Sequence, residues 1–169
     1  MLIDAESLKL LIETELIRVQ DTRVVSHVQA MLLEPYAIMR NWDYGTQGQQ
    51  YLCWMVLKDT VTSAEIGYCE DGFGPKCPWG LISSGEDQTM GMDSGWFSTF
   101  MDAYFESFAC TTLPIWRVFR VEPDGAKAPL TAEGDWDATW REVMQLREND
   151  PGRRYDCEHS ISYGQLAAS

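Results

Sequence analysis

Residues 36–69 read YAIMRNWDYGTQGQQYLCWMVLKDTVTSAEIGYC, a stretch with the pattern of three consecutive β-strands. Within residues 36–44 the side chains alternate at a two-residue period, and both faces of the segment are partly apolar. Residues 51–57 are continuously apolar, which is typical of a central strand, and residues 64–69 make the third segment. Because only short turns separate the segments, the sequence predicts an antiparallel meander.

Two amphipathic helices are predicted before the meander. Asp4 can cap the first helix, which is expected to run to about Val19, and Asp21 can cap the second, which Pro35 is expected to stop. Apolar residues recur at three- and four-residue spacing in both segments and give each helix one apolar stripe. The two helices are therefore expected to pack as a hairpin or to lie against the sheet.

Residues 70–95 form one conspicuous irregular stretch, EDGFGPKCPWGLISSGEDQTMGMDSG. Glycine and proline interrupt it repeatedly, and only residues 79–82 resemble a strand. A long loop in a compact domain is usually either functional or disordered. Its apolar side chains indicate order, so we expect the loop to be ordered and partly packed.

Two more helices and two more strands are predicted after this loop. A helix over residues 95–108 is expected to begin at the cap Ser94, and a strand is expected over residues 112–121. A further helix is expected over residues 135–147, and the alternating residues 155–163 can add an edge strand.

The expected fold class is α+β, with an antiparallel sheet of about five or six strands packed with about four helices. The chain has 169 residues, of which 45% are hydrophobic, so it contains enough apolar material to bury a core of its own. We therefore expect a single globular domain over residues 1–169.

The chain is strongly acidic, with a formal net charge of −13. A field of this sign repels nucleic acids and anionic membranes, and it speeds the encounter with basic partners. The alternative interpretation is that the charge serves solubility alone. Charged residues interrupt the N-terminal apolar segment, and the five cysteines are an odd number, so we expect reduced thiols and a cytoplasmic location.

No motif for catalysis or metal binding is evident. The only histidines are His27 and His159, and the spacing between Cys69 and Cys77 lacks the Cys-x2-Cys knuckle of a zinc site. Acidic clusters could serve a glycosidase only if the fold places two carboxylates about 5–10 Å apart across a cleft. The sequence therefore predicts no catalytic residue, no metal site and no cofactor.

The irregular stretch carries the residues with which we expect the protein to bind a partner. Aromatic side chains next to charged ones are typical of protein-binding hot spots. The alternative interpretation is that the aromatic residues belong to the core and that the acidic residues only surround it. The candidate residues are Glu70, Asp71, Phe73, Trp79, Glu86, Asp87, Asp93 and Trp96.

The segment IGYCEDGFGPKCPWGLI, residues 66–82, has the character of a small bacterial orphan family. In this segment and in its size, acidity, mixed helix and strand content and many tryptophans, the chain resembles bacterial immunity proteins. These are small cytoplasmic partners that neutralise secreted or contact-delivered toxins. The resemblance implies a non-catalytic inhibitor of a basic toxin domain, but it carries no motif and implies no particular site residue.

Two other functions stay open at this point. The protein could be a small cytoplasmic hydrolase that uses clustered carboxylates or a cysteine. It could also be a structural module that binds a second copy of itself and forms a homo-oligomer. A pocket with a strongly shifted carboxylate would favour the first function, and a concentration-dependent mass would favour the second.

Overall fold

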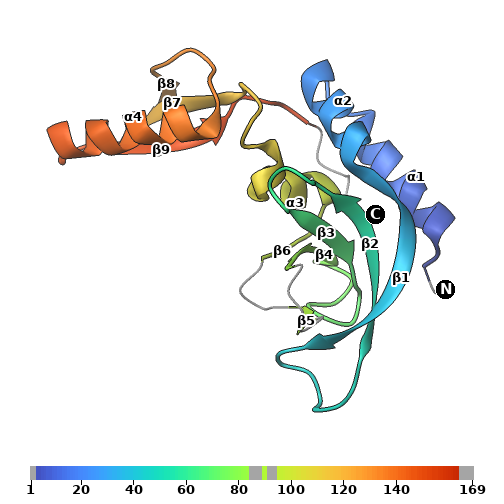
Figure 1. The fold of residues 1–169 in the computed structure, drawn as a ribbon. Helices are drawn as coiled ribbons and strands as arrows, with labels where there is room; N and C mark the ends of the chain where they lie inside the picture. The colour runs from blue at the N-terminus through green and yellow to red at the C-terminus, as the bar shows by residue number, and fades with distance from the viewer. Residues whose placement is uncertain (1–2, 84–88, 91–94, 164–169) are drawn as a thin grey trace. The chain divides into compact units, whose positions relative to one another are not determined.

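The predicted meander forms the centre of the larger of two sheets (Figure 1). The computed structural model describes residues 3–83, 89–90 and 95–163. In the six-stranded sheet the order is β5-β1-β2-β3-β4-β6, with β5 parallel to β1 and every other pair antiparallel. The strands are β1 (Leu32–Trp42), β2 (Tyr51–Lys58), β3 (Glu65–Tyr68), β4 (Trp79–Ile82), β5 (Thr89–Met90) and β6 (Trp96–Phe97).

Helices α1 (Ala5–Leu16) and α2 (Thr22–Met31) precede this sheet. Both predicted caps are confirmed, because the Asp4 carboxylate accepts from the backbone N–H of Ser7 at 2.8 Å and Asp21 accepts from that of Arg23 at 2.9 Å. The second helix ends earlier than expected, and Pro35 lies within β1, at an irregularity in the pairing of β1 with β2.

The third helix differs from the prediction. A helix was expected over residues 95–108, but α3 covers only Phe100–Glu106, and its cap is Thr99, whose hydroxyl accepts from the N–H of Asp102 at 3.0 Å. Trp96 and Phe97 instead pair with β4 as strand β6. The expected cap, Ser94, lies outside the described residues. The apolar spacing of residues 95–108 is compatible with a helix. Trp96 and Phe97 nevertheless form a strand, because their backbone pairs with β4.

Two layers of apolar residues flank the larger sheet. On one face, Trp79 lies between Tyr68 and Phe100 of α3, with ring centroids 4.9 Å and 5.4 Å away. The other face carries a second buried cluster, which consists of Cys53, Met55, Cys69 and Ile82 with Leu33, Ile38, Trp42, Tyr51 and Trp96 packed against them. We call this side the Cys53 face.

Residues Thr111–Ser162 form a second compact unit, which we call the C-terminal unit; residues up to Cys110 with Tyr163 belong to the N-terminal unit. In the C-terminal unit, helix α4 (Trp136–Asn149) packs against an antiparallel sheet of order β8-β7-β9, and Val118, Val143 and Tyr155 form its core. The strands are β7 (Trp116–Val121), β8 (Lys127–Pro129) and β9 (Arg154–His159). The tryptophan rings of residues 136 and 140 stack at 5.4 Å.

The α+β class is confirmed, and so is the predicted edge strand, which is β9. One sheet was expected, whereas the described residues form two, because β7 pairs with β8 and β9 and not with the meander. The chain divides into two compact units, and the single domain over residues 1–169 stays a prediction. None of the helices in the described ranges is long and apolar enough to cross a membrane.

Candidate functional site

Five aromatic side chains of the N-terminal unit form one continuous cluster, which we call the aromatic surface. The ring of Trp42 lies 6.5 Å from that of Tyr44, 5.9 Å from that of Tyr51 and 6.1 Å from that of Phe73. Phe73 in turn lies 5.9 Å from Trp96. Two members reach well into solvent, since Tyr44 is 68% and Phe73 is 43% exposed. Contiguous exposed apolar patches are uncommon on soluble proteins, and they often mark binding sites.

Three separate parts of the chain supply these rings. Trp42 ends β1 and Tyr51 begins β2, so the two rings meet at one end of this strand pair. Phe73 belongs to the loop between β3 and β4, and Trp96 belongs to β6. Pairing of β4 with β6 brings the last ring into the cluster.

Gly80 explains how Trp96 can lie so close to strand β4. The two residues are paired in register, and a Cβ atom at position 80 would lie 2.8 Å from the indole ring. Real Cβ atoms do not approach other atoms so closely, so only glycine leaves room for the ring at its present position. The indole ring of Trp96 therefore packs directly against the backbone of β4 at Gly80.

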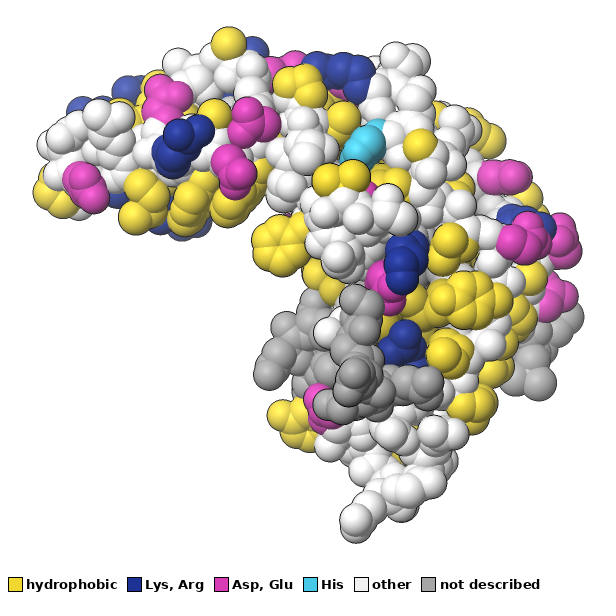
Figure 2. Space-filling view, viewed as in Figure 1, with side chains coloured by type: hydrophobic (Ala, Val, Ile, Leu, Met, Phe, Trp, Pro, Cys, Tyr) yellow, Lys and Arg dark blue, Asp and Glu magenta, His cyan; other side chains and the backbone are white. Residues whose placement is uncertain are grey.

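Three carboxylates lie close to members of the aromatic surface in the sequence. Asp43 lies between two members of the cluster, and Glu70 and Asp71 closely precede Phe73; all three acidic residues are exposed. The hydroxyl of Tyr68 donates to the Glu70 carboxylate at 2.7 Å, which holds that side chain in place. Burial and this hydrogen bond raise the pKa of Tyr68, so the phenol stays protonated as a donor. Figure 2 shows that hydrophobic side chains occupy much of the visible face of the N-terminal unit, with acidic and basic side chains among them.

Some of the predicted partner-binding residues lie on the surface, and one lies in the core. Phe73 and Trp96 meet in the aromatic surface, and Glu70 and Asp71 are exposed near them, but Trp79 is only 3% exposed and lies in the core. It offers no surface to a partner, because Tyr68 and Phe100 cover its ring. The remaining predictions, Glu86, Asp87 and Asp93, fall outside the described residues.

Sequence reasoning missed Trp42, Tyr44 and Tyr51 as members of the site. Trp42 and Tyr44 belong to an alternating segment and Tyr51 to a continuous apolar run, and both patterns indicate only strands. Aromatic residues at both ends of a short connection were the signal that could have found them, because antiparallel pairing brings such positions together.

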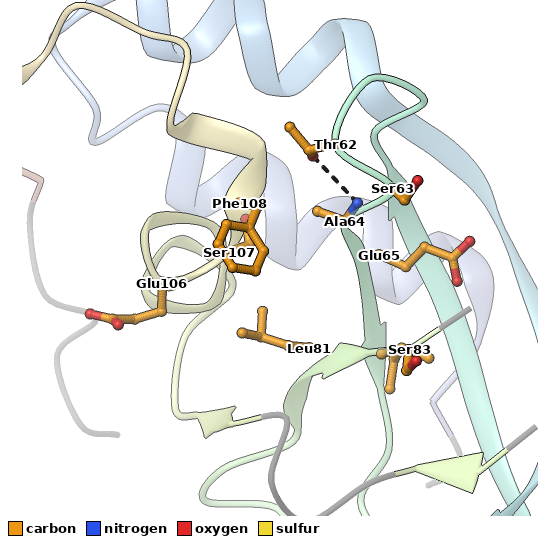
Figure 3. Close-up of a pocket in the computed structure, with 10 residues that line it drawn as sticks. Thr62, Ser63, Ala64, Glu65, Leu81, Ser83, Glu106, Ser107 and Phe108 are labelled. Atoms are coloured by element: carbon orange, nitrogen blue, oxygen red, sulfur yellow. Dashed lines mark hydrogen bonds between the residues drawn. The ribbon is translucent and has the colours of Figure 1, made fainter. Parts of the chain in front are cut away.

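A cavity of about 370 Å³ lies elsewhere in the N-terminal unit, between the β2–β3 turn, the end of β4 and the end of α3 (Figure 3). Its two carboxylates, Glu65 and Glu106, point away from one another. Glu65 forms a salt bridge with Lys58, in which Nζ lies 2.6 Å from Oε1. The hydroxyl of Ser107 donates to the Tyr104 carbonyl at 2.7 Å. Among its described lining residues, the cavity therefore presents no pair of facing carboxylates of the kind that glycoside hydrolysis uses.

Four of the five cysteines are held as neutral thiols by burial. Burial raises the pKa of Cys53 and Cys110 to about 12 and that of Cys157 to about 11, and it raises the pKa of Cys69 as well. A nucleophilic or metal-binding cysteine requires the opposite shift, because the thiolate is its reactive form. Burial therefore favours the unreactive thiol form at these four positions.

His27 belongs to the helix packing of the N-terminal unit. Its Nδ1 lies 2.8 Å from the hydroxyl of Tyr104, and burial lowers the pKa of the imidazole. In the described part of the chain, no group of three or more histidine, cysteine, aspartate or glutamate side chains is arranged to hold a metal ion. We take the aromatic surface as the candidate binding site of the N-terminal unit.

Comparison with protein-family models, with curated proteins and with solved structures finds no match for this chain.

Proposed function

We propose that the protein is a non-catalytic binding protein that holds a basic protein partner on its aromatic surface. The observation that carries this proposal is the contact of Phe73 with both Trp42 and Trp96, next to the exposed carboxylates of Glu70 and Asp71. Large rigid rings bury much area at a small cost in side-chain entropy, and they dominate the binding energy of many interfaces.

The charge of the chain favours a basic partner over an acidic one. The formal net charge is −13, and Asp43, Glu70 and Asp71 add local negative charge at the aromatic surface. Complementary charge speeds association and disfavours partners of like charge. This combination suits an inhibitor that must capture a basic toxin quickly, so we propose that the protein acts in the cytoplasm as an immunity protein.

The test compares the full-length tagged wild type with two charge-reversal variants as bait in extracts of the cells that produce it. One variant, Glu70→Lys with Asp71→Lys, alters the proposed site. The matched control, Glu142→Lys with Glu148→Lys, alters exposed residues of α4 and changes the net charge equally. We expect the wild type and the control to hold one basic protein that dissociates faster as the salt concentration rises. The site variant should bind it at least about tenfold more weakly.

Equal binding by the two variants, or recovery of no basic protein, would overturn the proposed surface. The immunity role has its own test, in which the captured partner is expressed alone and together with this protein. Growth arrest that co-expression relieves would support the role, and a harmless partner would remove it while leaving the binding proposal intact. A mass that rises with concentration would instead favour self-association.

A further inference from the structure

Arg40 is a buried cation on the Cys53 face of the larger sheet. It lies on β1 opposite Tyr51, and only 6% of its surface is exposed. The positions two residues before and after it on the strand, Ile38 and Trp42, share its face and pack against the buried cluster that contains Cys53 and Met55. A guanidinium group therefore lies among apolar side chains.

Most of the N–H donors of the Arg40 side chain lack a hydrogen-bond acceptor among the described residues. Its Nη2 has one weak acceptor, the sulfur of Met55 at 3.8 Å, whereas Nε and Nη1 have no hydrogen-bond partner among the described residues. The indole Nε1 of Trp42 is also buried and without a partner in the same described set. Two positions on one face of β1 thus carry donors for which the described residues supply no acceptor.

A buried guanidinium group with unpaired N–H donors is stabilised by a bound anion. In general, burial does not neutralise an arginine side chain as it can neutralise a lysine. An unpaired buried charge is strongly unfavourable, and natural structures almost always supply a counter-charge. Here that counter-charge is missing from the described residues around Arg40.

We propose that Arg40 and Trp42 form a binding site for a small monocarboxylate. The two oxygens of a carboxylate match adjacent N–H groups of one guanidinium, and the indole N–H of Trp42 can supply a further donor. A single negative charge balances the single cation, whereas a dianionic phosphate would leave an excess of negative charge in a protein that is already strongly acidic. The apolar neighbours Ile38, Cys53 and Met55 favour a short apolar substituent on the carboxylate.

This inference is independent of the proposed protein partner, although Trp42 belongs to both sites. Arg40 is buried and takes no part in the aromatic surface, so its replacement separates the two functions. The Trp42 ring contacts the exposed rings of Tyr44 and Phe73, and so connects the carboxylate site with the surface of the molecule.

The test is a titration of the isotope-labelled protein with sodium propionate at constant ionic strength, followed by NMR of the arginine Nε–H and tryptophan Nε1–H signals. Sodium chloride and inorganic phosphate serve as control anions. We expect a saturable shift of the Arg40 and Trp42 signals and a higher Tm with propionate, and at least about tenfold weaker binding of phosphate. Arg40→Met should abolish the response, and Trp42→Phe should weaken it while keeping an aromatic ring.

The wild-type titration decides the proposal even if Arg40→Met does not fold. Absence of a saturable shift would overturn it, and so would equal responses to propionate and chloride. A third contrary result is that the Arg40 Nε–H signal of the ligand-free protein moves when Glu86, Asp87 or Asp93 is changed to its amide. The chain itself would then supply the carboxylate, and no external ligand would be required.

Discussion

The rings of Trp42 and Phe73 lie 6.1 Å apart at an interplanar angle of 67°, an edge-on contact between the end of strand β1 and the loop that follows β3. Through this contact the aromatic side chains of two separate segments become one surface. Phe73 also touches Trp96, so it is the residue that joins the two halves of the cluster.

Replacement of Phe73 by alanine should therefore weaken partner binding while leaving the fold intact. We expect a loss of about 2 kcal/mol in binding free energy, which is typical of an aromatic hot-spot residue. Isothermal titration with the captured basic partner measures this loss, and urea unfolding checks that the free energy of unfolding changes little. Val61→Ala is the control, since Val61 is 82% exposed and lies in the β2–β3 turn. Equal losses for the two variants would contradict the role of Phe73.

Gly80→Ala should disturb the position of Trp96. The added Cβ would meet the indole ring at 2.8 Å, and moving a packed ring costs about 1–3 kcal/mol of stability. Gly72→Ala is the matched control, because its Cβ would lie at an ordinary 3.8 Å from the same ring. Urea unfolding and tryptophan fluorescence of both variants measure the difference. A Gly80 variant as stable as the Gly72 variant would show that the ring moves freely.

Glu15 should make the stability of the protein depend on pH. Its carboxylate is buried and accepts hydrogen bonds from the backbone N–H groups of Phe100, at 3.1 Å, and Met101, at 2.9 Å. Burial outweighs these bonds and raises the pKa of Glu15 above its usual 4.5. Between the unfolded and the folded pKa the folded state binds more protons, so stability falls as pH rises through this window.

Glu15→Gln has no carboxyl group to titrate. We therefore expect the free energy of unfolding of the wild type, minus that of the variant, to decrease as pH rises from about 4 to about 7. Urea unfolding across this range measures the difference, with Glu13→Gln, an exposed site on the same helix, as the control. A difference that stays constant or grows with pH would contradict the prediction.

The cysteines should differ in their reactivity towards thiol reagents. Cys53, Cys69 and Cys110 are buried, and burial raises the pKa of each, so both the thiolate and access to it are lacking in the folded protein. Cys77 is partly exposed, and we expect iodoacetamide to modify it first at pH 8. Mass spectrometry of peptides after timed labelling gives the order. Rapid labelling of Cys53 in the folded state would indicate that the Cys53 face opens.

Much of the local structure could be predicted from neighbouring residues alone. Asp4 and Asp21 cap their helices as expected, since a cap needs only a side-chain oxygen within three residues of the N–H groups that it satisfies. The apolar run that begins at Tyr51 forms a strand near the centre of the sheet because such a run must be buried on both faces. Both signals lie within a few residues of the structure that they specify.

Pairing between distant segments decided the rest. Trp96 fits a helix by its spacing, yet it forms a strand because β4 offers backbone partners and Gly80 offers space. Trp79 and Phe73 are equally plausible surface aromatics in the sequence, but the register of β3 with β4 places Trp79 against Phe100, in the core.

The sequence by itself determined the α+β class, the acidic charge and the positions of the first two helices. Only the tertiary structure decided which aromatic rings meet at the surface, that β7 joins a second sheet, and that Arg40 is buried among apolar side chains. The physical reason is that exposure and burial depend on contacts between residues far apart in the chain, whereas caps, turns and strand periods depend on contacts within a few residues.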